Sequence, residues 1–240
     1  MRIPKVRGVI RRRLLVNFRV DPKVIRQHLP SRFRPKLHAG NAIAGICLIR
    51  LENIRPTGLP SIVGLSSENA AHRIAVAWDT ETGPHEGVFI PRRDTGSFLN
   101  HLVGGHLFPG EHHRAVFSVR ETDNNVQLRM QSADQKVRVE INGRVSPAWP
   151  ATSVFGSLGE ASAFFEAGSL GYSATAAGNR LDAVALHTDQ WIVEPLAIDH
   201  IYSSFFEDRE LFPPGSATFD CALIMRNIAH EWHTAEDMYI

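Results

Sequence analysis

The feature that most constrains the fold of this chain is a series of alternating apolar and polar residues in its middle third. Residues 126–130 (VQLRM) and 137–141 (VRVEI) alternate, and the apolar run 115–120 (AVFSVR) precedes them. Turn-forming segments at 123–125 (DNN) and 133–135 (ADQ) separate the three runs. Alternation with a period of two is typical of strands with one buried face. The pattern predicts an antiparallel meander.

The rest of the chain adds more strands and few helices. Further strands are predicted at 14–20, 41–51, 73–78, 183–186, 191–201 and 218–225. Asp21 and Pro22 can cap a short helix that runs to about Leu29, and a helix-like segment starts near Ser97. Ser157 and Glu160 have the spacing of a capping box for a helix over 158–167. We expect one domain over residues 1–240, an α+β fold of mainly antiparallel β-sheet in which a barrel- or cone-like closure removes the strand edges.

Composition narrows the class of protein. With 43% hydrophobic residues, 21% charged residues and a net charge of +1, the 240-residue chain is typical of a globular protein, and no basic stripe indicates nucleic-acid binding. No apolar run reaches the roughly 18–20 residues that span a bilayer, and no secretory signal is evident. Cys47 and Cys221 lie in apolar runs and indicate buried thiols in the cytoplasm, although a disulfide between them stays possible.

Common catalytic and cofactor motifs are missing from the sequence. The twelve histidines include His230 and His233, but their spacing is not that of a zinc-binding helix, and neither cysteine has a soft ligand nearby. The segment around Ser157 does not match the nucleophile motif of hydrolases. Gly104 and Gly105 lack the partners of a phosphate-binding loop. We therefore predict no metal and no cofactor.

Arg92 and Arg93 are the strongest candidates for ligand binding. They follow the apolar run 87–90 and Pro91, at what the pattern indicates is the end of a strand. A guanidinium is always charged and can bind a carboxylate or phosphate through two parallel hydrogen bonds. Glu68 lies just before the predicted strand 73–78, and in an apolar cavity it could move protons. A solvated or ion-paired glutamate is an equal alternative for Glu68.

The order of elements resembles the acetoacetate decarboxylase-like proteins. The opening segment 14–22 (LLVNFRVDP) with its short helix carries the first part of this resemblance. The segments 87–90, 157–161, 164–165, 171–173 and 191–201 resemble more closely the branch known as domain of unknown function 2071. The resemblance implies a barrel- or cone-like β fold with a pocket for a small carbonyl or carboxylate compound. It also implies that Glu68 lies near the family's pocket glutamate, and Arg11 near its substrate-binding arginine.

The resemblance fails at the reactive lysine. Acetoacetate decarboxylase forms a Schiff base with one lysine of a pair that follows a proline, and this chain has Arg92 and Arg93 after Pro91. Arginine cannot supply the neutral amine that an imine requires. The four lysines of the chain lie elsewhere, at positions 5, 23, 36 and 136. Schiff-base decarboxylation is therefore not expected.

Three hypotheses follow for the function. The first is a pocket in which Arg11, Arg92 and Arg93 bind a small anionic or carbonyl ligand, with Glu68 as acceptor or proton shuttle. The second is a lyase or hydrolase that uses Glu68 with His72 or His101. The third is a structural domain that self-associates into a homo-oligomer through its C-terminal strands. Whether any reaction is catalysed stays open at this point.

Overall fold

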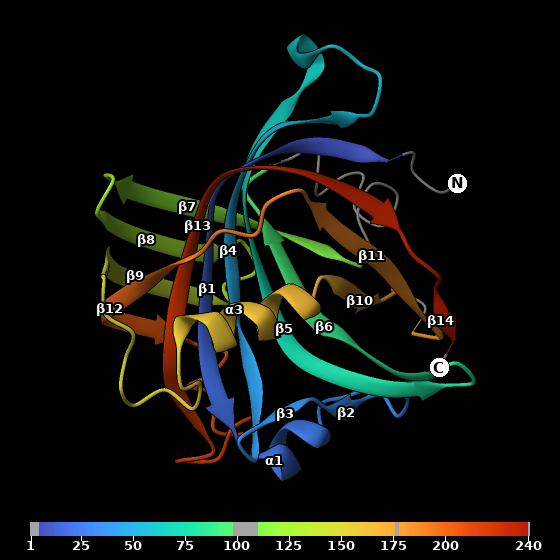
Figure 1. The fold of residues 1–240 in the computed structure, drawn as a ribbon, viewed down its shortest axis with the longest axis vertical. Coiled ribbons are helices and arrows are strands. Elements are labelled where there is room, and N and C mark those ends of the chain that lie inside the picture. Colours follow the sequence, from blue (N-terminus) through green and yellow to red (C-terminus); the bar gives the residue numbers. More distant parts are fainter. Residues whose placement is uncertain (1–4, 98–109, 176–177, 240) are drawn as a thin grey trace.

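The computed structural model describes residues 5–97, 110–175 and 178–239, and the helix expected from Ser97 falls mostly outside this range. Within it, fourteen strands form one sheet with few helices (Figure 1). The elements are β1 (Val6–Val20), α1 (Pro22–Arg26), β2 (Arg34–Pro35), β3 (Leu37–His38), β4 (Asn41–Pro56), η1 (Ser61–Val63), β5 (Leu65–Thr80), β6 (Gly83–Thr95), β7 (His112–Glu121), β8 (Asn125–Ser132), β9 (Arg138–Val145), α3 (Leu158–Ala167), β10 (Leu170–Ala174), β11 (Arg180–Thr188), β12 (Glu194–Ser203), β13 (Ala217–Thr234) and β14 (Met238–Tyr239). The predicted α+β class, with mainly antiparallel strands, is confirmed.

Hydrogen bonding closes the sheet into two rings that share five long strands. The pairing of β5 with β6 closes a larger ring through β7, β8, β9, β12, β13, β1 and β4. The pairing of β11 with β13 closes a smaller ring through β10, β6, β5, β4 and β1. Most neighbours are antiparallel, while β6 pairs in parallel with β7 and with β10. Closure satisfies strand edges that would otherwise be free to pair with other chains.

The shared strands are buried on both faces, so the protein has two hydrophobic cores. On β1, Leu14 and Val16 pack into the core that includes the meander β7–β8–β9, whereas Leu15 packs into the second core. Helix α3 covers the second core and contributes Ala161 and Phe165 (Figure 1). Successive side chains of a strand point to opposite faces, which is how one strand serves both cores.

The predicted helix starts at Asp21 and at Ser157 are confirmed. The Asp21 side chain accepts a hydrogen bond from the Lys23 amide at 2.8 Å, and a proline occupies the first turn of α1. The Ser157 side chain accepts from the Glu160 amide at the start of α3. These caps satisfy amide donors that have no partner inside a helix.

Several predicted boundaries are wrong. Strand β1 begins at Val6 rather than at Leu14, β4 ends at Pro56 rather than at Leu51, and β13 ends at Thr234 rather than at Met225. Three further differences concern α1, β6 and β5. Helix α1 ends at Arg26 rather than near Leu29. Strand β6 does not stop at Pro91 but continues to Thr95. Strand β5 begins at Leu65, so Glu68 lies inside it rather than before it. The proline is accommodated where the pairing of β5 and β6 shifts register, between His72 and Ile74, because proline cannot donate a ladder hydrogen bond.

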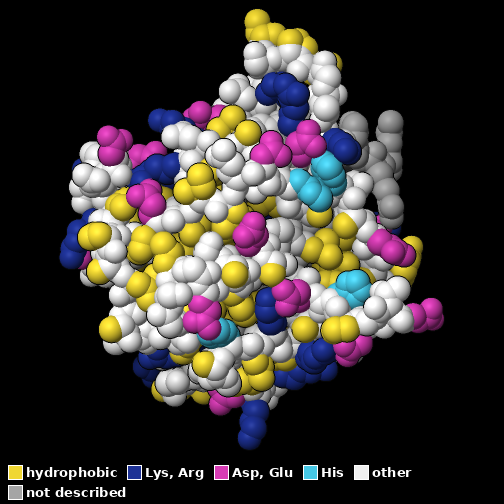
Figure 2. Space-filling view, in the orientation of Figure 1, with side chains coloured by type: hydrophobic (Ala, Val, Ile, Leu, Met, Phe, Trp, Pro, Cys, Tyr) yellow, Lys and Arg dark blue, Asp and Glu magenta, His cyan; other side chains and the backbone are white. Residues whose placement is uncertain are grey.

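A hairpin formed by the ends of β4 and β5 projects beyond the rings, with η1 at its tip (Figure 1). Hydrophobic side chains are visible on this tip in Figure 2, and Ile62 there is 89% exposed. The tip residues lie apart from those that line the cavity described below.

At Gly45, strands β1 and β4 lie too close together for a larger side chain. A Cβ atom at Gly45 would lie 2.4 Å from the carbonyl oxygen of Val16, well inside van der Waals contact. We expect Gly45→Ala to lower the free energy of unfolding by about 1–3 kcal/mol, as overpacked cores do. The control is Gly159→Ala in α3, where the nearest atom is 3.8 Å away and alanine favours the helix. Urea denaturation would measure both, and unchanged stability of Gly45→Ala would contradict the strand spacing.

Candidate functional site

The strands of the smaller ring line a partly open cavity of about 120 Å³. Each of these seven strands supplies at least one residue of its wall, and Gly168 and Ser169 come from the connection between α3 and β10. Most lining side chains are apolar: Ile49, Leu51, Val88, Ile90, Val184 and Leu186. A protein cavity of about 150 Å³ can hold benzene, so this cavity suits a ligand of roughly six non-hydrogen atoms.

Three arginines interrupt the apolar wall. Arg13 of β1, Arg73 of β5 and Arg93 of β6 all line the cavity. Across β4, β5 and β6, Cys47, Ala71 and Arg93 lie opposite one another, and Arg73 is two residues along β5 from Ala71. Residues that pair across strands, or that lie two apart on one strand, share a face of the sheet. The register therefore brings arginines from distant parts of the chain to one cavity.

Arg13 and Arg93 keep donor nitrogens without partners. Arg13 Nε donates to the Cys47 sulfur at 3.3 Å, and its guanidinium lies 5.3 Å from the centre of the Trp191 ring. Arg93 Nε donates to Ser173 Oγ at 3.1 Å. Arg13 Nη1 and Arg93 Nη2 are buried and have no hydrogen-bond partner among the described residues. Both guanidinium groups therefore keep unused hydrogen-bonding capacity next to the cavity.

Arg73 is the most buried of the three, at 7% exposed. It donates through one terminal nitrogen to the Asn17 side chain, and its guanidinium lies 4.8 Å from the centre of the Phe165 ring. Its Nε has no hydrogen-bond partner in the described part of the chain. Asn17 and Phe165 fix the position of the guanidinium without neutralising its charge.

The cavity is positively charged at neutral pH. Burial lowers the pKa of Arg73 and of Arg93 to about 10, so both stay protonated. Within the described residues, no carboxylate forms an ion pair with Arg13, Arg73 or Arg93. Asp94 also lines the cavity, but it is paired with Arg92. Uncompensated buried charge is costly, and a bound anion would compensate it.

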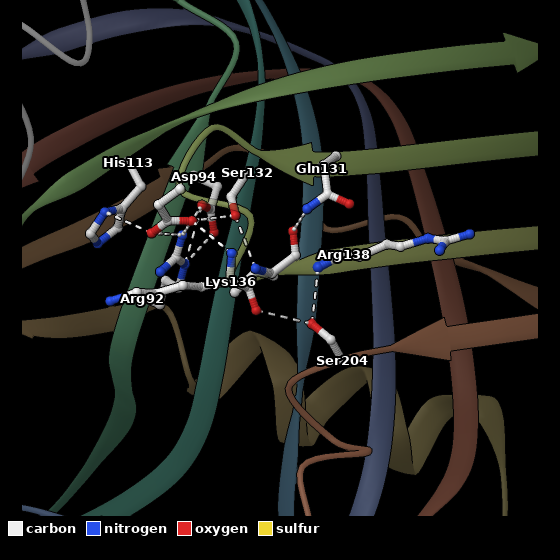
Figure 3. Close-up of polar contacts among 10 residues, drawn as sticks. Arg92, Asp94, His113, Gln131, Ser132, Lys136, Arg138 and Ser204 are labelled. Carbon is white, nitrogen blue, oxygen red and sulfur yellow. Dashed lines mark hydrogen bonds and ion pairs between the residues drawn. The ribbon is translucent and has the colours of Figure 1, made fainter.

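Arg92 and Arg93 do not act as a pair. Adjacent residues of a strand point to opposite faces, and Arg92 points away from the cavity that Arg93 lines. Arg92 Nη2 lies 2.8 Å from Asp94 Oδ1 and 3.0 Å from Asp134 Oδ2. Figure 3 shows the guanidinium of Arg92 next to the carboxylate of Asp94. Arg92 therefore does not line this cavity, although a second cavity, of about 220 Å³, is lined by both Arg92 and Arg93.

Glu68 does not line the cavity. It lies on β5 an odd number of residues from Arg73, on the opposite face of that strand. Its carboxylate contacts Arg12 Nη2 at 2.6 Å, and Arg12 also pairs with Glu121 at 3.0 Å. Burial raises the pKa of Glu68 although Arg12 opposes the shift. The ion-paired alternative for Glu68 fits this geometry, and the proposed proximity of Glu68 to the cavity arginines is corrected.

Arg11 also lies outside the cavity. It is exposed and donates to the Asn227 side chain. The pairing of β1 with β4 shifts register between Ile10 and Arg12, which displaces Arg11 from the regular alternation. Arg13, two residues further along β1, occupies the cavity wall instead.

The predicted partners of Glu68 are not brought to the cavity either. His72 is fully buried and packs against Phe205, with 4.5 Å between ring centres, and burial lowers its pKa to about 3. It shares the face of β5 that carries Glu68. His101 lies outside the described residues.

Sequence reasoning missed Arg13, Arg73 and Cys47 as cavity residues. Arg13 directly precedes the predicted strand 14–20, and Arg73 is the first residue of the predicted strand 73–78. The sequence did contain a signal for Arg13 and Arg73, because each is a charged residue next to an apolar strand segment. When such a strand is buried, its charged side chain needs an ion-pair partner, a hydrogen-bond partner or a polar cavity.

Two further observations concern metals and membranes. Among the described residues, no group of three or more His, Cys, Asp or Glu side chains could hold a metal ion. In the same part of the chain, no helix is both long enough and apolar enough to cross a bilayer.

Comparison with known proteins identifies one matching family. The model for domain of unknown function 2071, described as an uncharacterized conserved protein, matches residues 9–223. No protein with curated annotation matches the sequence.

Solved structures of similar fold include several acetoacetate decarboxylase-like proteins. Acetoacetate decarboxylase from Legionella pneumophila is 10% identical with a TM-score of 0.59, over 98% of this chain and 88% of that one. An acetoacetate decarboxylase-like enzyme from Sphingomonas wittichii is 12% identical with a TM-score of 0.59, over 100% and 94%. The enduracididine biosynthesis enzyme MppR, complexed with pyruvate, is 12% identical with a TM-score of 0.54, over 100% and 91%. These likenesses show a shared fold.

Proposed function

The chain belongs to the family of domain of unknown function 2071, and on this premise we propose that it binds a small organic carboxylate in the arginine-lined cavity. Arg93 and Arg73 bind the carboxylate, and Arg13 completes the positive wall. Of the residues first expected to bind the ligand, Arg93 keeps that role in this proposal, while Arg11 and Arg92 do not.

The observation that carries this proposal is the set of buried donors without partners. Arg13 Nη1, Arg73 Nε and Arg93 Nη2 belong to three residues that line a single cavity. A buried donor without a partner costs about 1–3 kcal/mol, and more when it is charged. A carboxylate supplies acceptors for such donors and offsets the charge of the guanidinium groups.

The size of the cavity and the fold neighbours both favour a 2-oxo acid. About 120 Å³ suits a molecule of roughly six non-hydrogen atoms, the size of pyruvate. MppR, which shares the fold, has been solved with pyruvate bound. The apolar side chains around the arginines would contact the short carbon chain of such an acid.

The proposal contains no imine. None of the four lysines belongs to the described wall of the cavity. Lys36, for example, forms an ion pair with Glu86 at 2.8 Å. The protein therefore binds the carboxylate of its ligand through charge and hydrogen bonds, and no amine nucleophile is required.

Calorimetric titration with pyruvate and with its neutral amide, pyruvamide, tests the proposal. We expect pyruvate to bind and pyruvamide to bind at least about 30-fold more weakly, because a buried charge pair contributes about 2 kcal/mol or more. Titration with inorganic phosphate, an anion of different shape, shows whether the affinity for pyruvate depends on the shape of the ligand as well as on its charge. No heat with pyruvate, or equal affinity for its amide, would contradict the proposal.

A further inference from the structure

A thiol lies among the charged groups of the cavity. Cys47 is on β4, opposite Ala71, and its side chain faces the cavity with 8% of its surface exposed. Arg13 Nε donates to its sulfur at 3.3 Å. Arg73 and Arg93 lie on the same face and interact electrostatically with Cys47.

The sulfur of Cys47 thus lies beside the same guanidinium groups that line the cavity. A cysteine reacts as a nucleophile through its sulfur. The buried, unpartnered Nε of Arg73 points independently to a ligand in the same cavity. Such a ligand would be bound next to the sulfur.

The second cysteine offers a comparison within the same chain. Cys221 of β13 is 1% exposed and does not line the cavity. Burial, with the charge of Asp220, raises the pKa of Cys221 to about 12. Cys221 is therefore expected to be unreactive in the folded protein.

We propose that Cys47 is a nucleophile that adds reversibly to the carbonyl carbon of a bound 2-oxo acid. This inference rests on the proposed carboxylate-binding function. The sulfur forms a bond to the carbonyl carbon, and the π electrons of the C=O bond move to oxygen. The thiol proton is transferred to that oxygen, so the product is a hemithioketal, with no oxidant and no leaving group. The guanidinium groups stabilise the negative charge that develops on oxygen.

Alkylation of the wild-type protein tests the reactivity of Cys47. Iodoacetate carries a carboxylate and iodoacetamide does not, and peptide mass spectrometry reports each cysteine separately. In the folded protein we expect iodoacetate to modify Cys47 about tenfold faster than iodoacetamide does, because a positive cleft concentrates anions. Alkylation of the same protein unfolded in urea gives the relative rates of the two reagents without the cavity. In the folded protein, Cys221 should stay unmodified. An unreactive Cys47, or the same order of reagents in folded and unfolded protein, would overturn the inference.

Nuclear magnetic resonance of pyruvate labelled with ¹³C at its carbonyl carbon tests the covalent step. We expect a new signal in the tetrahedral-carbon region with wild type and Cys221→Ala, and its loss with Cys47→Ala. Calorimetry of the same samples separates the two proposals. If pyruvate binds but wild type shows no tetrahedral signal, the nucleophile is wrong and the binding site stands. If pyruvate does not bind, both are wrong.

Discussion

Replacing Arg93 by methionine should weaken pyruvate binding about 30-fold or more. Loss of one partner of a buried, hydrogen-bonded charge pair costs about 2–5 kcal/mol, and 1.4 kcal/mol corresponds to a factor of ten. Arg93 is well suited to this test because Arg93 Nη2 has no other partner among the described residues. Calorimetric titration of the variant measures the change in affinity.

The same substitution should not destabilise the ligand-free protein. Burial lowers the pKa of Arg93 to about 10, so the folded protein binds this proton less tightly than the unfolded chain does. The charge therefore destabilises the fold at neutral pH, by an amount on the order of 3 kcal/mol. Methionine removes that cost and loses one hydrogen bond to Ser173. We expect urea denaturation to show equal or higher stability.

Arg11→Met is the matched control for Arg93→Met. Arg11 is an arginine of the same sheet that is exposed and lies outside the cavity. Its replacement should leave pyruvate affinity unchanged. Equal loss of affinity in the two variants would indicate a general effect of charge, and unchanged affinity in Arg93→Met would remove Arg93 from the site.

The largest loss of stability is expected from Arg12→Met. Arg12 is 1% exposed and pairs with Glu68 and Glu121. Its loss leaves the Glu68 carboxylate, which is 15% exposed, without its closest cation, and Arg50 remains 3.9 Å away. Breaking a buried ion pair by removing one partner costs about 3–5 kcal/mol. Glu121→Gln should cost much less, because the Glu121 side chain is 34% exposed. Urea denaturation at pH 7 measures both variants.

The pH dependence of Arg12→Met identifies the cause of its instability. Burial raises the pKa of Glu68, and Arg12 lowers it, so the substitution should raise this pKa further. Between the unfolded and folded pKa values of an acid whose pKa is raised, the folded state binds more protons, and stability increases as the pH falls. The deficit relative to wild type should therefore be smaller at about pH 5 than at pH 7. The double variant Arg12→Met, Glu68→Gln should be more stable than Arg12→Met at pH 7. A deficit that is independent of pH would contradict this explanation.

The strands with one buried face were predicted with the most accurate bounds. The alternation of 126–130 and 137–141 located β8 and β9 because one side of that meander is solvated. Strands shared by both rings are buried on both faces, so β4 has no alternation from Ala42 to Ile49. Their ends, and the pairings that close the rings, depend on contacts between residues far apart in sequence.

The candidate site was harder to predict, because a shift of one residue exchanges the two faces of a strand. The register shift between Ile10 and Arg12 left Arg11 outside and placed Arg13 in the cavity wall. The alternation along β6 separates Arg92 from Arg93. Residue types indicated a site rich in arginine, but only the register shows which arginines meet.

A crystal structure of the protein with pyruvate would show directly whether the arginines of the cavity bind a carboxylate. We predict pyruvate inside the smaller ring, with a carboxylate oxygen about 2.7–3.2 Å from Arg93 Nη2 or Arg73 Nε. An empty cavity at saturating pyruvate, or pyruvate bound only outside the ring, would contradict the account.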